Sequence, residues 1–430
     1  MMGIYPHPNP PPQAREGEKA IEVIGETDSL STVPTNARLC RDARQRVRLS
    51  TLKLLRKMVS VFLLSLLFLT LQPAHAQPYT IEVVASGLQN PRGVAFLPDG
   101  RMLLAEAGTG YDSGDPADYT GKLSVLTDHN GDGDYDDADE RTAIIEQQPG
   151  YNILYQFNPG RDEIVGMGDV LALPDGRSFY TLDDHFETLS VNEVTPELKR
   201  KGYFYLSDST LNALAYDPNT KRMYVAESTS NLLTVLSPNG DDRTLVTFDL
   251  LAHDQQPVPA GLAVDPLTGD VLVALFSGQL WSYYGEILSF MPGDAKVVRV
   301  NPQTGAVTDA ITNLTTAIDV AVDEAGNIYV VEMTTEWPTP TMNHKFELYS
   351  PDAPPDAGGY ARYTGRVSRY PAGGGEAVIL AEDLDAPTNL TYHEGALYVS
   401  VGQGTPNRPI WVKGERRTIS GTVVKITLPT

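Results

Sequence analysis

Short apolar runs separated by turns dominate the chain, and the stretch from Asn90 to Gly108 shows the pattern in its simplest form. An apolar run (Val94 to Leu97) leads into the turn Pro98-Asp99-Gly100, and a second apolar run (Met102 to Ala105) follows. Proline presets φ, aspartate bonds back to its own backbone, and glycine takes the positive φ that such a turn needs. This stretch therefore predicts a β-hairpin.

Five further stretches repeat the hairpin pattern along the chain. They are Gly168 to Tyr180, Asn212 to Glu227, Ala260 to Leu275, Ile318 to Glu332 and Thr388 to Val401. A single hairpin cannot bury both of its faces, and no helical periodicity separates the copies. The repeats predict an all-β fold, a six-bladed β-propeller. Another repetitive all-β fold, such as a sandwich, is the alternative.

The two ends of the repeat region are expected to close the ring. Tyr79 to Ala85 is a strand-like run before the first repeat, and Gly421 to Leu428 is one after the sixth. Because unpaired strand edges are a liability, we expect these N- and C-terminal strands to pair in one closing blade. Outer strands are expected in four further pairs of runs: Leu123 to Thr127 with Ala143 to Glu146, Leu232 to Leu236 with Thr244 to Phe248, Val297 to Val300 with Val307 to Ile311, and Gly365 to Tyr370 with Ala377 to Ala381.

The remaining residues fall in long connections rich in Gly, Pro, Tyr and Asp. These are Gly108 to Gly121, Gln147 to Glu163, Asp183 to Leu206, Phe276 to Pro292 and Met333 to Thr364. Long loops on one face of a rigid ring are where binding specificity normally resides. A small molecule, a carbohydrate or a protein bound on this loop face is therefore the expected partner.

The N-terminal residues have the features of an export signal. A basic segment (Lys53 to Lys57) precedes an apolar core (Val59 to Leu71) and the small-x-small site Ala74-His75-Ala76. Residues 53–76 are therefore expected to be a secretory signal peptide, cleaved near Ala76. Its apolar core is too short for a membrane span. Residues 1–52 are Pro-rich and unpatterned, and we interpret them as an upstream extension from a start codon assigned too early.

Charge and cysteine content restrict the partners of the mature chain. The full sequence has a net charge of −22, and residues 77–430 alone carry 23 basic and 49 acidic side chains, a net charge of −26. Such an acidic surface argues against nucleic acid and anionic membranes as partners. Cys40 is the single cysteine and precedes the cleavage site, so the mature chain has no disulfide and no thiol nucleophile.

Residues 128–140 carry the most specific chemical motif. Oxygen side chains at positions 1, 3, 5, 9 and 12 of this acidic loop, with Gly133 at position 6, reproduce the EF-hand spacing. The predicted calcium ligands are Asp128, Asn130, Asp132, Asp134 through its carbonyl, Asp136 and Asp139, with Glu140 as a neighbouring candidate. Since the flanking runs are strands, the sequence predicts a structural calcium at a hairpin tip. A solvated acidic turn is the alternative.

A second group of carboxylates is predicted from the alignment of the repeats. Asp169, Asp319 and Asn389 occupy the start of the inner strand, and Glu106, Glu227 and Glu332 occupy the end of the next strand. Equivalent positions in a ring face a common axis, so these six residues form a candidate channel site that would hold a second metal or shift each other's pKa. In the alternative, each acid caps amides of its own blade or meets an arginine such as Arg92.

Signatures of nucleophilic catalysis are absent from the sequence. It contains no G-x-S-x-G elbow, no zinc-type histidine pair and no P-loop. The histidines of the mature chain are scattered, and His185 is the one nearest to a plausible site.

Three stretches carry a family resemblance. Gly87 to Gly108, Pro257 to Val264, and Ala317 to Glu332 resemble the ScyD/ScyE family, which are secreted bacterial propellers. NHL-repeat, gluconolactonase-like and soluble quinoprotein dehydrogenase propellers share these sequence motifs. The resemblance covers most of residues 80–430 and implies a propeller fold and an extracytoplasmic location, but no reaction.

Three functions remain open from the sequence. The first is a secreted, calcium-stabilised binding or scaffold protein, and the absence of nucleophile signatures favours it. The second is a metal-dependent lactonase or related hydrolase that uses a channel-bound calcium as Lewis acid. The third is a quinoprotein-type sugar dehydrogenase, for which the sequence offers no histidine base and no basic cluster.

Overall fold

The computed structural model of the chain describes residues 79–429, except residues 112, 153–161, 185–187, 240, 279, 282–286, 289 and 337–359. All of them belong to one compact unit, Ala76–Thr430. The expected upstream extension (residues 1–52) and signal peptide (residues 53–76) lie outside the described residues. Within the described part of the chain, no helix is long and apolar enough to cross a membrane.

Six four-stranded antiparallel sheets form the described structure, and each sheet is one blade of a β-propeller. Blade 1 contains β2 (Pro91–Phe96), β3 (Met102–Glu106), β4 (Gly121–Leu126) and β5 (Arg141–Gln148); blade 2 contains β8 (Met167–Ala172), β9 (Ser178–Asp184), β10 (Thr188–Val194) and β11 (Arg200–Ser207); blade 3 contains β12 (Leu211–Asp217), β13 (Arg222–Glu227), β14 (Leu232–Leu236) and β15 (Asp242–Thr247). Blade 4 contains β16 (Pro259–Val264), β17 (Val271–Leu275), β20 (Ala295–Val300) and β21 (Val307–Leu314); blade 5 contains β22 (Ala317–Val322), β23 (Ile328–Glu332), β24 (Gly365–Tyr370) and β25 (Val378–Leu384); blade 6 contains β26 (Asn389–His393), β27 (Ala396–Val401), β30 (Gly421–Thr427) and β1 (Thr80–Leu88).

Small elements decorate the connections between these strands. Three two-stranded ribbons pair β6 (Tyr151–Asn152) with β7 (Ile164–Val165), β18 (Leu280–Trp281) with β19 (Ile287–Leu288), and β28 (Pro409–Val412) with β29 (Glu415–Thr418). Two single turns of 3-10 helix, η1 (Pro116–Asp118) and η2 (Ala252–Asp254), complete the described elements.

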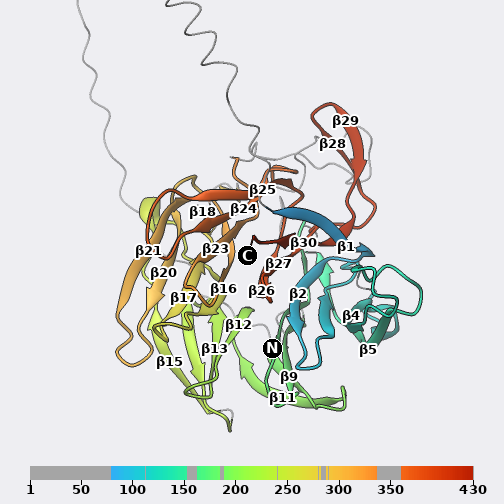
Figure 1. Cartoon of the computed structure of the whole chain (residues 1–430), viewed down its shortest axis with the longest axis horizontal. Helices are drawn as coiled ribbons and strands as arrows, with labels where there is room; N and C mark the ends of the chain where they lie inside the picture. Colours follow the sequence, from blue (N-terminus) through green and yellow to red (C-terminus); the bar gives the residue numbers. More distant parts are fainter. Residues whose placement is uncertain are drawn as a thin grey trace, which may run out of the picture. The chain divides into compact units, whose positions relative to one another are not determined.

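The inner strands of the blades form a ring. Each inner strand contacts that of the next blade, and β26 of blade 6 contacts β2 of blade 1. Figure 1 shows β2, β12, β16 and β26 near the centre, with β5, β11, β15 and β21 at the periphery. The predicted six-bladed propeller is therefore confirmed.

The two ends of the described chain close this ring as expected. β1 pairs with β30 in an antiparallel register that places Thr80 opposite Thr427 and Val83 opposite Val424. β30 also pairs with β27, so the N-terminal strand is the outermost strand of blade 6. The edge of β30 is thereby covered, which explains why both terminal runs carry a strand pattern.

The Asp-Gly turn of the repeats has the geometry that its residues predict. Gly100 has a φ of 87°, and its N–H donates to Leu97 O at 2.9 Å. Asp99 Oδ1 accepts the Arg101 N–H at 3.2 Å, which fixes the turn from its side chain. Blade 2 repeats the arrangement at Asp175, whose Oδ1 accepts from Arg177 N at 3.1 Å.

The four predicted outer pairs form in the structure, but one predicted loop is wrong. Asp183 to Leu206 is mostly β10 and β11, the outer strands of blade 2. Pro196 lies in the tight turn between them, where Thr195 N donates to Lys199 O at 2.8 Å. β11 is the exposed outermost strand of its blade, and its mixed polar and apolar residues hide the strand pattern.

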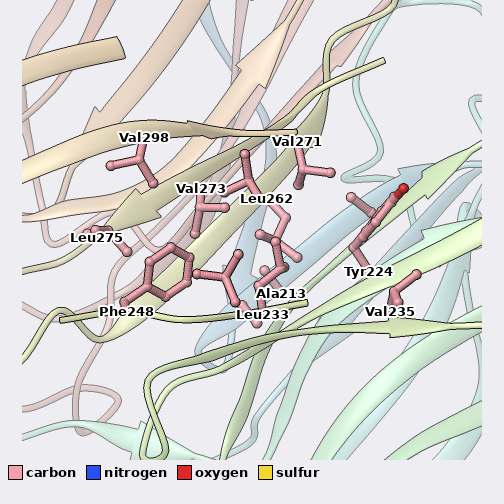
Figure 2. Close-up of a cluster of buried hydrophobic side chains, with 14 of the residues drawn as sticks. Ala213, Tyr224, Leu233, Val235, Phe248, Leu262, Val271, Val273, Leu275 and Val298 are labelled. Atoms are coloured by element: carbon pink, nitrogen blue, oxygen red, sulfur yellow. The ribbon is translucent and has the colours of Figure 1, made fainter. Parts of the chain in front are cut away.

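Apolar side chains fill the spaces between neighbouring blades. Leu103 and Ala105 of β3 pack against blade 2, whereas Met102 and Leu104 of the same strand pack against blade 6. Because successive side chains of a strand point to opposite faces, a strand buried on both faces reads as a continuous apolar run. Figure 2 shows one such cluster, in which Tyr224 and Leu233 of blade 3 meet Leu262 and Val273 of blade 4.

The long connections emerge on the face where the inner strands begin, here called the loop face. The end of the second strand lies beside the start of the inner strand, as in the pairs Pro91–Glu106, Pro259–Leu275 and Ala317–Glu332. The connections that follow β3, β17 and β23 therefore leave the blades on this same face. The sequence expectation of long loops on one face of the ring holds for these three connections.

Candidate functional site

Three polar side chains meet in the centre of the ring and form a structure here called the polar belt: Asp169 of β8, Asp319 of β22 and Asn389 of β26. Asn389 Nδ2 donates to Asp319 Oδ2 at 2.9 Å and to Asp169 Oδ1 at 3.3 Å. These are the three residues that the repeat alignment placed at the start of the inner strands. The structure brings them together as predicted.

The polar belt satisfies one backbone N–H from every blade. Asp169 accepts Val170 N and Leu214 N, each at 2.8 Å, through its two oxygens. Asp319 accepts Val320 N and Leu390 N, each at 2.8 Å, and also the N–H of Leu262. Asn389 Oδ1 accepts Val94 N at 3.1 Å. The six donors follow one another around the ring: Val94, Val170, Leu214, Leu262, Val320 and Leu390.

Glycines stand at the equivalent positions of two other blades, where the Asp319 side chain approaches Gly261 and the backbone of blade 2 approaches Gly93. A Cβ on Gly261 would lie 2.3 Å from Asp319 Oδ1, and one on Gly93 would lie 2.2 Å from Val170 N. Each inner strand is therefore pressed directly against its neighbour at the level of the polar belt. Only glycine permits this approach at both positions.

Burial changes the acidity of the two carboxyl groups. Desolvation raises the pKa of Asp169 to about 7, against the lowering effect of its hydrogen bonds to backbone amides and Asn389. The pKa of Asp319 is raised well above its usual range, first by burial and then by the charge of Asp169. The belt therefore holds a proton more tightly than two ordinary aspartates do.

The three glutamates predicted for the channel lie elsewhere. Glu106 accepts Gln89 N at 2.7 Å and pairs with Lys122 at 3.3 Å, and Glu332 accepts Thr315 N at 2.7 Å and pairs with Arg366 at 2.6 Å. Glu227 accepts the hydroxyls of Tyr205, Ser207 and Thr234. All three are buried. Glu106 and Glu332 accept an amide and pair with a cation, close to the capping alternative, whereas the described partners of Glu227 are all hydroxyls. The six-residue channel site is thus corrected to three residues.

The polar belt separates two cavities, both of which Asp169 and Asn389 line. On the loop face the cavity measures about 270 Å³, and on the opposite face about 320 Å³. The second is lined mainly by the inner strands, with Phe96 stacked on His393 at 3.8 Å. Burial lowers the pKa of His393.

The loop-face cavity combines apolar walls with three charged groups besides the belt. Val165, Met167, Leu211, Val258, Ala260 and Ile318 supply apolar walls, and Thr210, Asn212, Ser228, Thr229 and Thr388 supply polar ones. The charged groups are Arg92, Glu163 and Asp183. Small-molecule sites commonly have this composition, a mostly apolar concavity with a few placed polar groups.

The two acids of this cavity are held by neighbouring hydroxyls. Tyr360 donates to Glu163 Oε2 at 2.9 Å. Tyr151 and Thr210 each donate to Asp183 Oδ2 at 3.2 Å. Burial, followed by the charge of Asp183, raises the pKa of Tyr151, so that its hydroxyl stays protonated and keeps donating.

Arg92 is the cationic group among the described lining residues of this cavity. Its Nη2 donates to Ile164 O at 2.5 Å, and its Nε is buried without a hydrogen-bond partner. Desolvation lowers the pKa of the guanidinium, and the more distant charges of Glu163 and Tyr360 oppose this effect. The sequence predicted Arg92 only as a possible ion-pair partner of the channel acids. Its place in the cavity wall was missed.

A buried ionic network fixes the loop that carries Glu163. Asp162 pairs with Arg408 at 2.6 Å, both side chains being 1% exposed, and accepts Asn152 Nδ2 at 2.9 Å. Nearby, Arg362 pairs with Asp385 at 2.6 Å. These residues come from connections without a repeat pattern, so the sequence offered no signal for them. The network gives the cavity wall a rigid support.

Two of the predicted calcium ligands, Asp128 and Asn130, form hydrogen bonds within the loop. Asp128 accepts Gly131 N at 2.6 Å and Gly133 N at 3.0 Å. Asn130 Nδ2 donates to Asp132 Oδ2 and to Asp137 Oδ2, each at 2.8 Å. The charge of Glu140, followed by desolvation, raises the pKa of Asp137.

Within the described part of the loop, the predicted ligands Asp134, Asp136 and Asp139 do not bond to the Asp128 and Asn130 side chains. Asp136 turns to Ser86, accepting its N–H and its hydroxyl at 2.8 Å each, and pairs with Arg141. Asp134 Oδ1 accepts Asp136 N at 2.9 Å, and Asp139 is exposed. Glu140 is buried and accepts His129 N at 2.9 Å. In the described residues, no group of three or more His, Cys, Asp or Glu side chains is arranged to hold a metal ion.

Comparisons with known proteins report the fold and no family. No protein-family profile and no curated protein matches the chain. Structural matches include a putative oxidoreductase (glucose dehydrogenase) of Thermus thermophilus, with 12% identity, 81% of this chain and 99% of that chain covered, and a TM-score of 0.49. A PQQ-bound aldose sugar dehydrogenase of Streptomyces coelicolor has 10% identity, with 81% of this chain and 98% of that chain covered and a TM-score of 0.46. Virginiamycin B lyase of Staphylococcus aureus has 12% identity, with 81% of this chain and 99% of that chain covered and a TM-score of 0.42.

These matches are β-propeller proteins with different reported activities. At such identities and scores they carry no argument about what this chain does. The resemblance to the ScyD/ScyE family rests on the sequence motifs alone.

Proposed function

We propose that the chain is a secreted, calcium-stabilised propeller of the ScyD/ScyE type that acts as a binding protein. Its ligand is a small polar molecule that occupies the loop-face cavity. His185, the histidine nearest to a site in the sequence, lies outside the described residues.

The state of the polar belt carries this proposal. In a metal-dependent hydrolase of the type considered above, the channel carboxylates would present free oxygens to a cation. Here the oxygens of Asp169 and Asp319 accept backbone N–H groups, and Asn389 directs its NH₂ group toward both acids. Turning the Asn389 amide over would set its NH₂ group against Val94 N, a donor. The oxygens of Asp169, Asp319 and Asn389 are therefore better suited to accepting hydrogen bonds between blades than to coordinating a metal ion.

The quinoprotein alternative finds little support in the same cavity. Several carboxylates of a bound quinone would require several basic groups. Arg92 is the cationic residue among the described lining residues, and Glu163 and Asp183 lie in the same wall. A cavity of about 270 Å³ with mixed donors and acceptors suits a smaller ligand.

The calcium is proposed to stabilise the hairpin between β4 and β5 rather than to take part in ligand binding. The proposed oxygen ligands are the side chains of Asp128, Asn130 and Asp132 and the carbonyl of Asp134. Asp136 and Asp139 are proposed as the ligands at positions 9 and 12 of the loop. Asp137 and Glu140, one residue further along, are the competing pair because Asp137 already contacts Asn130. In either case the ion neutralises a loop whose acids repel one another.

Thermal unfolding of the mature chain with a library of small polar molecules tests the binding proposal. A ligand of the cavity should raise the unfolding temperature saturably, because it binds the folded state alone. Thr229→Trp, which places a large side chain in the cavity wall, should abolish the shift. Thr308→Trp, at an exposed position of β21, is the matched control and should retain it. A shift that survives Thr229→Trp would place the ligand elsewhere and refute the proposal.

A further inference from the structure

Arg92 is a half-buried cation with a buried Nε, and it forms no ion pair with a described residue. Its Nε has no hydrogen-bond partner, and its guanidinium donates from Nη2 to Ile164 O, a neutral carbonyl. Removing a charge from water without a direct ion-pair partner is costly, and a bound anion would offset this cost. Arg92 also lines the loop-face cavity.

From this arrangement we propose that the ligand of the loop-face cavity is a small monocarboxylate anchored by Arg92. The inference rests on the binding function proposed above and names its ligand class. A carboxylate matches the planar fork of a guanidinium with two parallel hydrogen bonds, whereas a neutral hydroxyl meets only one donor. The cation thereby gains the direct ion-pair partner that no described residue provides.

The acids of the same cavity define the rest of the ligand. Glu163 and Asp183 are held in place by Tyr360, Tyr151 and Thr210. Among the described lining residues two carboxylates accompany one cation; they repel a dianion such as phosphate, and they accept hydrogen bonds. The ligand therefore carries hydroxyl or ammonium groups besides its one carboxylate.

The belt sets the depth of the site. Asp169 and Asn389 form the floor of the cavity and are occupied by interblade hydrogen bonds. A ligand thus enters from the loop face only and stops above the belt. Its size is limited to what about 270 Å³ accommodates.

The first test compares matched ligands on the unaltered mature chain, secreted from the full-length gene. Hydroxy- and amino-monocarboxylates are titrated calorimetrically beside their primary amides, the corresponding neutral polyols, and inorganic phosphate and chloride. Carboxylates should bind at least about tenfold more tightly than their amides, with affinity falling as salt rises. Equal binding of acids and amides, or binding of inorganic anions only, would overturn the inference.

Variants of the anchor provide the second test. Arg92→Gln should weaken carboxylate binding at least about tenfold, Arg92→Lys should give an intermediate loss, and Arg101→Gln on the opposite-face turn should leave it unchanged. Arg92→Met should unfold, without ligand, at the same or a higher temperature than the parent, because a partly desolvated charge without a direct ion pair is gone. A lower unfolding temperature combined with unchanged carboxylate affinity would assign Arg92 to the fold and overturn the inference.

Thr229→Trp separates the two proposals. If neutral polyols bind as well as acids and Thr229→Trp blocks them, the cavity is a binding site and only the carboxylate assignment fails. If carboxylates bind and Thr229→Trp leaves them unaffected, the site is not this cavity and the proposed function fails with it.

Discussion

The side-chain amide of Asn389 donates to Asp319 Oδ2 at 2.9 Å, and this bond joins blade 6 to blade 5 at the centre of the ring. The same NH₂ group reaches Asp169 Oδ1 of blade 2 at 3.3 Å. One neutral amide thus lies between two acids from opposite sides of the propeller. In this role it replaces a cation, since it offers two N–H donors to two buried carboxyl groups.

Protonation of the belt should make stability depend on pH. The pKa of Asp169 is raised to about 7 from an unfolded value of about 3.9, so between these values the folded state binds more protons than the unfolded state. Stability from this group is therefore fully present below pH about 4 and is lost as pH rises through about 7. Asp169→Asn cannot titrate and lacks one acceptor, so it should be less stable by about 1–3 kcal/mol in acid, with the difference narrowing toward pH 8. Urea denaturation from pH 4.5 to 8 measures this, and a difference that widens with pH contradicts it.

The close approach of blades 4 and 5 should not tolerate a methyl group. A Cβ at position 261 would overlap the Asp319 carboxylate at 2.3 Å, so Gly261→Ala should destabilise the fold by about 1–3 kcal/mol through overpacking. Gly373→Ala is the matched control, because no atom lies within 4 Å of its Cβ position and its φ is not left-handed. Equal denaturation midpoints for the two variants would show that the belt can shift to make room.

Calcium should stabilise the mature chain through the 128–140 hairpin. At a calcium concentration about 100 times the Kd, the free energy of unfolding should rise by about 2.7 kcal/mol, and EGTA should reverse the gain. Asp132→Ala should remove the effect, whereas Asp309→Ala, on the exposed strand β21, should not. Comparing Asp136→Ala with Asp137→Ala in the same titration decides which acid binds the ion, since only the ligand's loss weakens calcium affinity.

The glutamate at the end of β23 should matter for stability and not for ligand binding. Glu332 is 1% exposed and pairs with Arg366, which is about one-third exposed, so solvent screens part of the interaction. Glu332→Gln should cost about 1–3 kcal/mol of stability and leave cavity ligands bound with parental affinity. Glu324→Gln, an exposed acid in the turn before β23, serves as the control. A loss of ligand affinity in Glu332→Gln would return this residue to the channel site.

The sequence was sufficient to predict the ring of blades, because the local signals for strands and turns recur along it. Runs such as Met102 to Ala105 are apolar at every position since both faces of the strand are buried, and turns such as Asp99-Gly100 carry their own geometry. The same alignment placed Asp169, Asp319 and Asn389 correctly, because residues at equivalent starts of inner strands face one axis.

The alignment failed for residues whose direction is decided by partners far away in the sequence. Glu106 and Glu332 occupy equivalent positions too, but amides and cations of their own blades draw them away from the axis. Arg92 and Asp162 acquire their roles from loops without any repeat, such as that carrying Arg408. β11 was missed because an exposed outer strand has no strict alternation, and β10 was missed although it is buried, because Asn192 and Glu193 interrupt its apolar run.

The pairing of Thr80 with Thr427 has a consequence for the order of events in biosynthesis. Among the described strands, the outermost strand of blade 6 is made first, and the strand on which it docks is made last. Contacts at such a large sequence separation carry a large loop-closure entropy, and the ring cannot close before β30 is synthesised. The ring thus stays open until β30 has emerged, which suits the proposed export across a membrane before folding, and a chain truncated before residue 421 has no partner for β1.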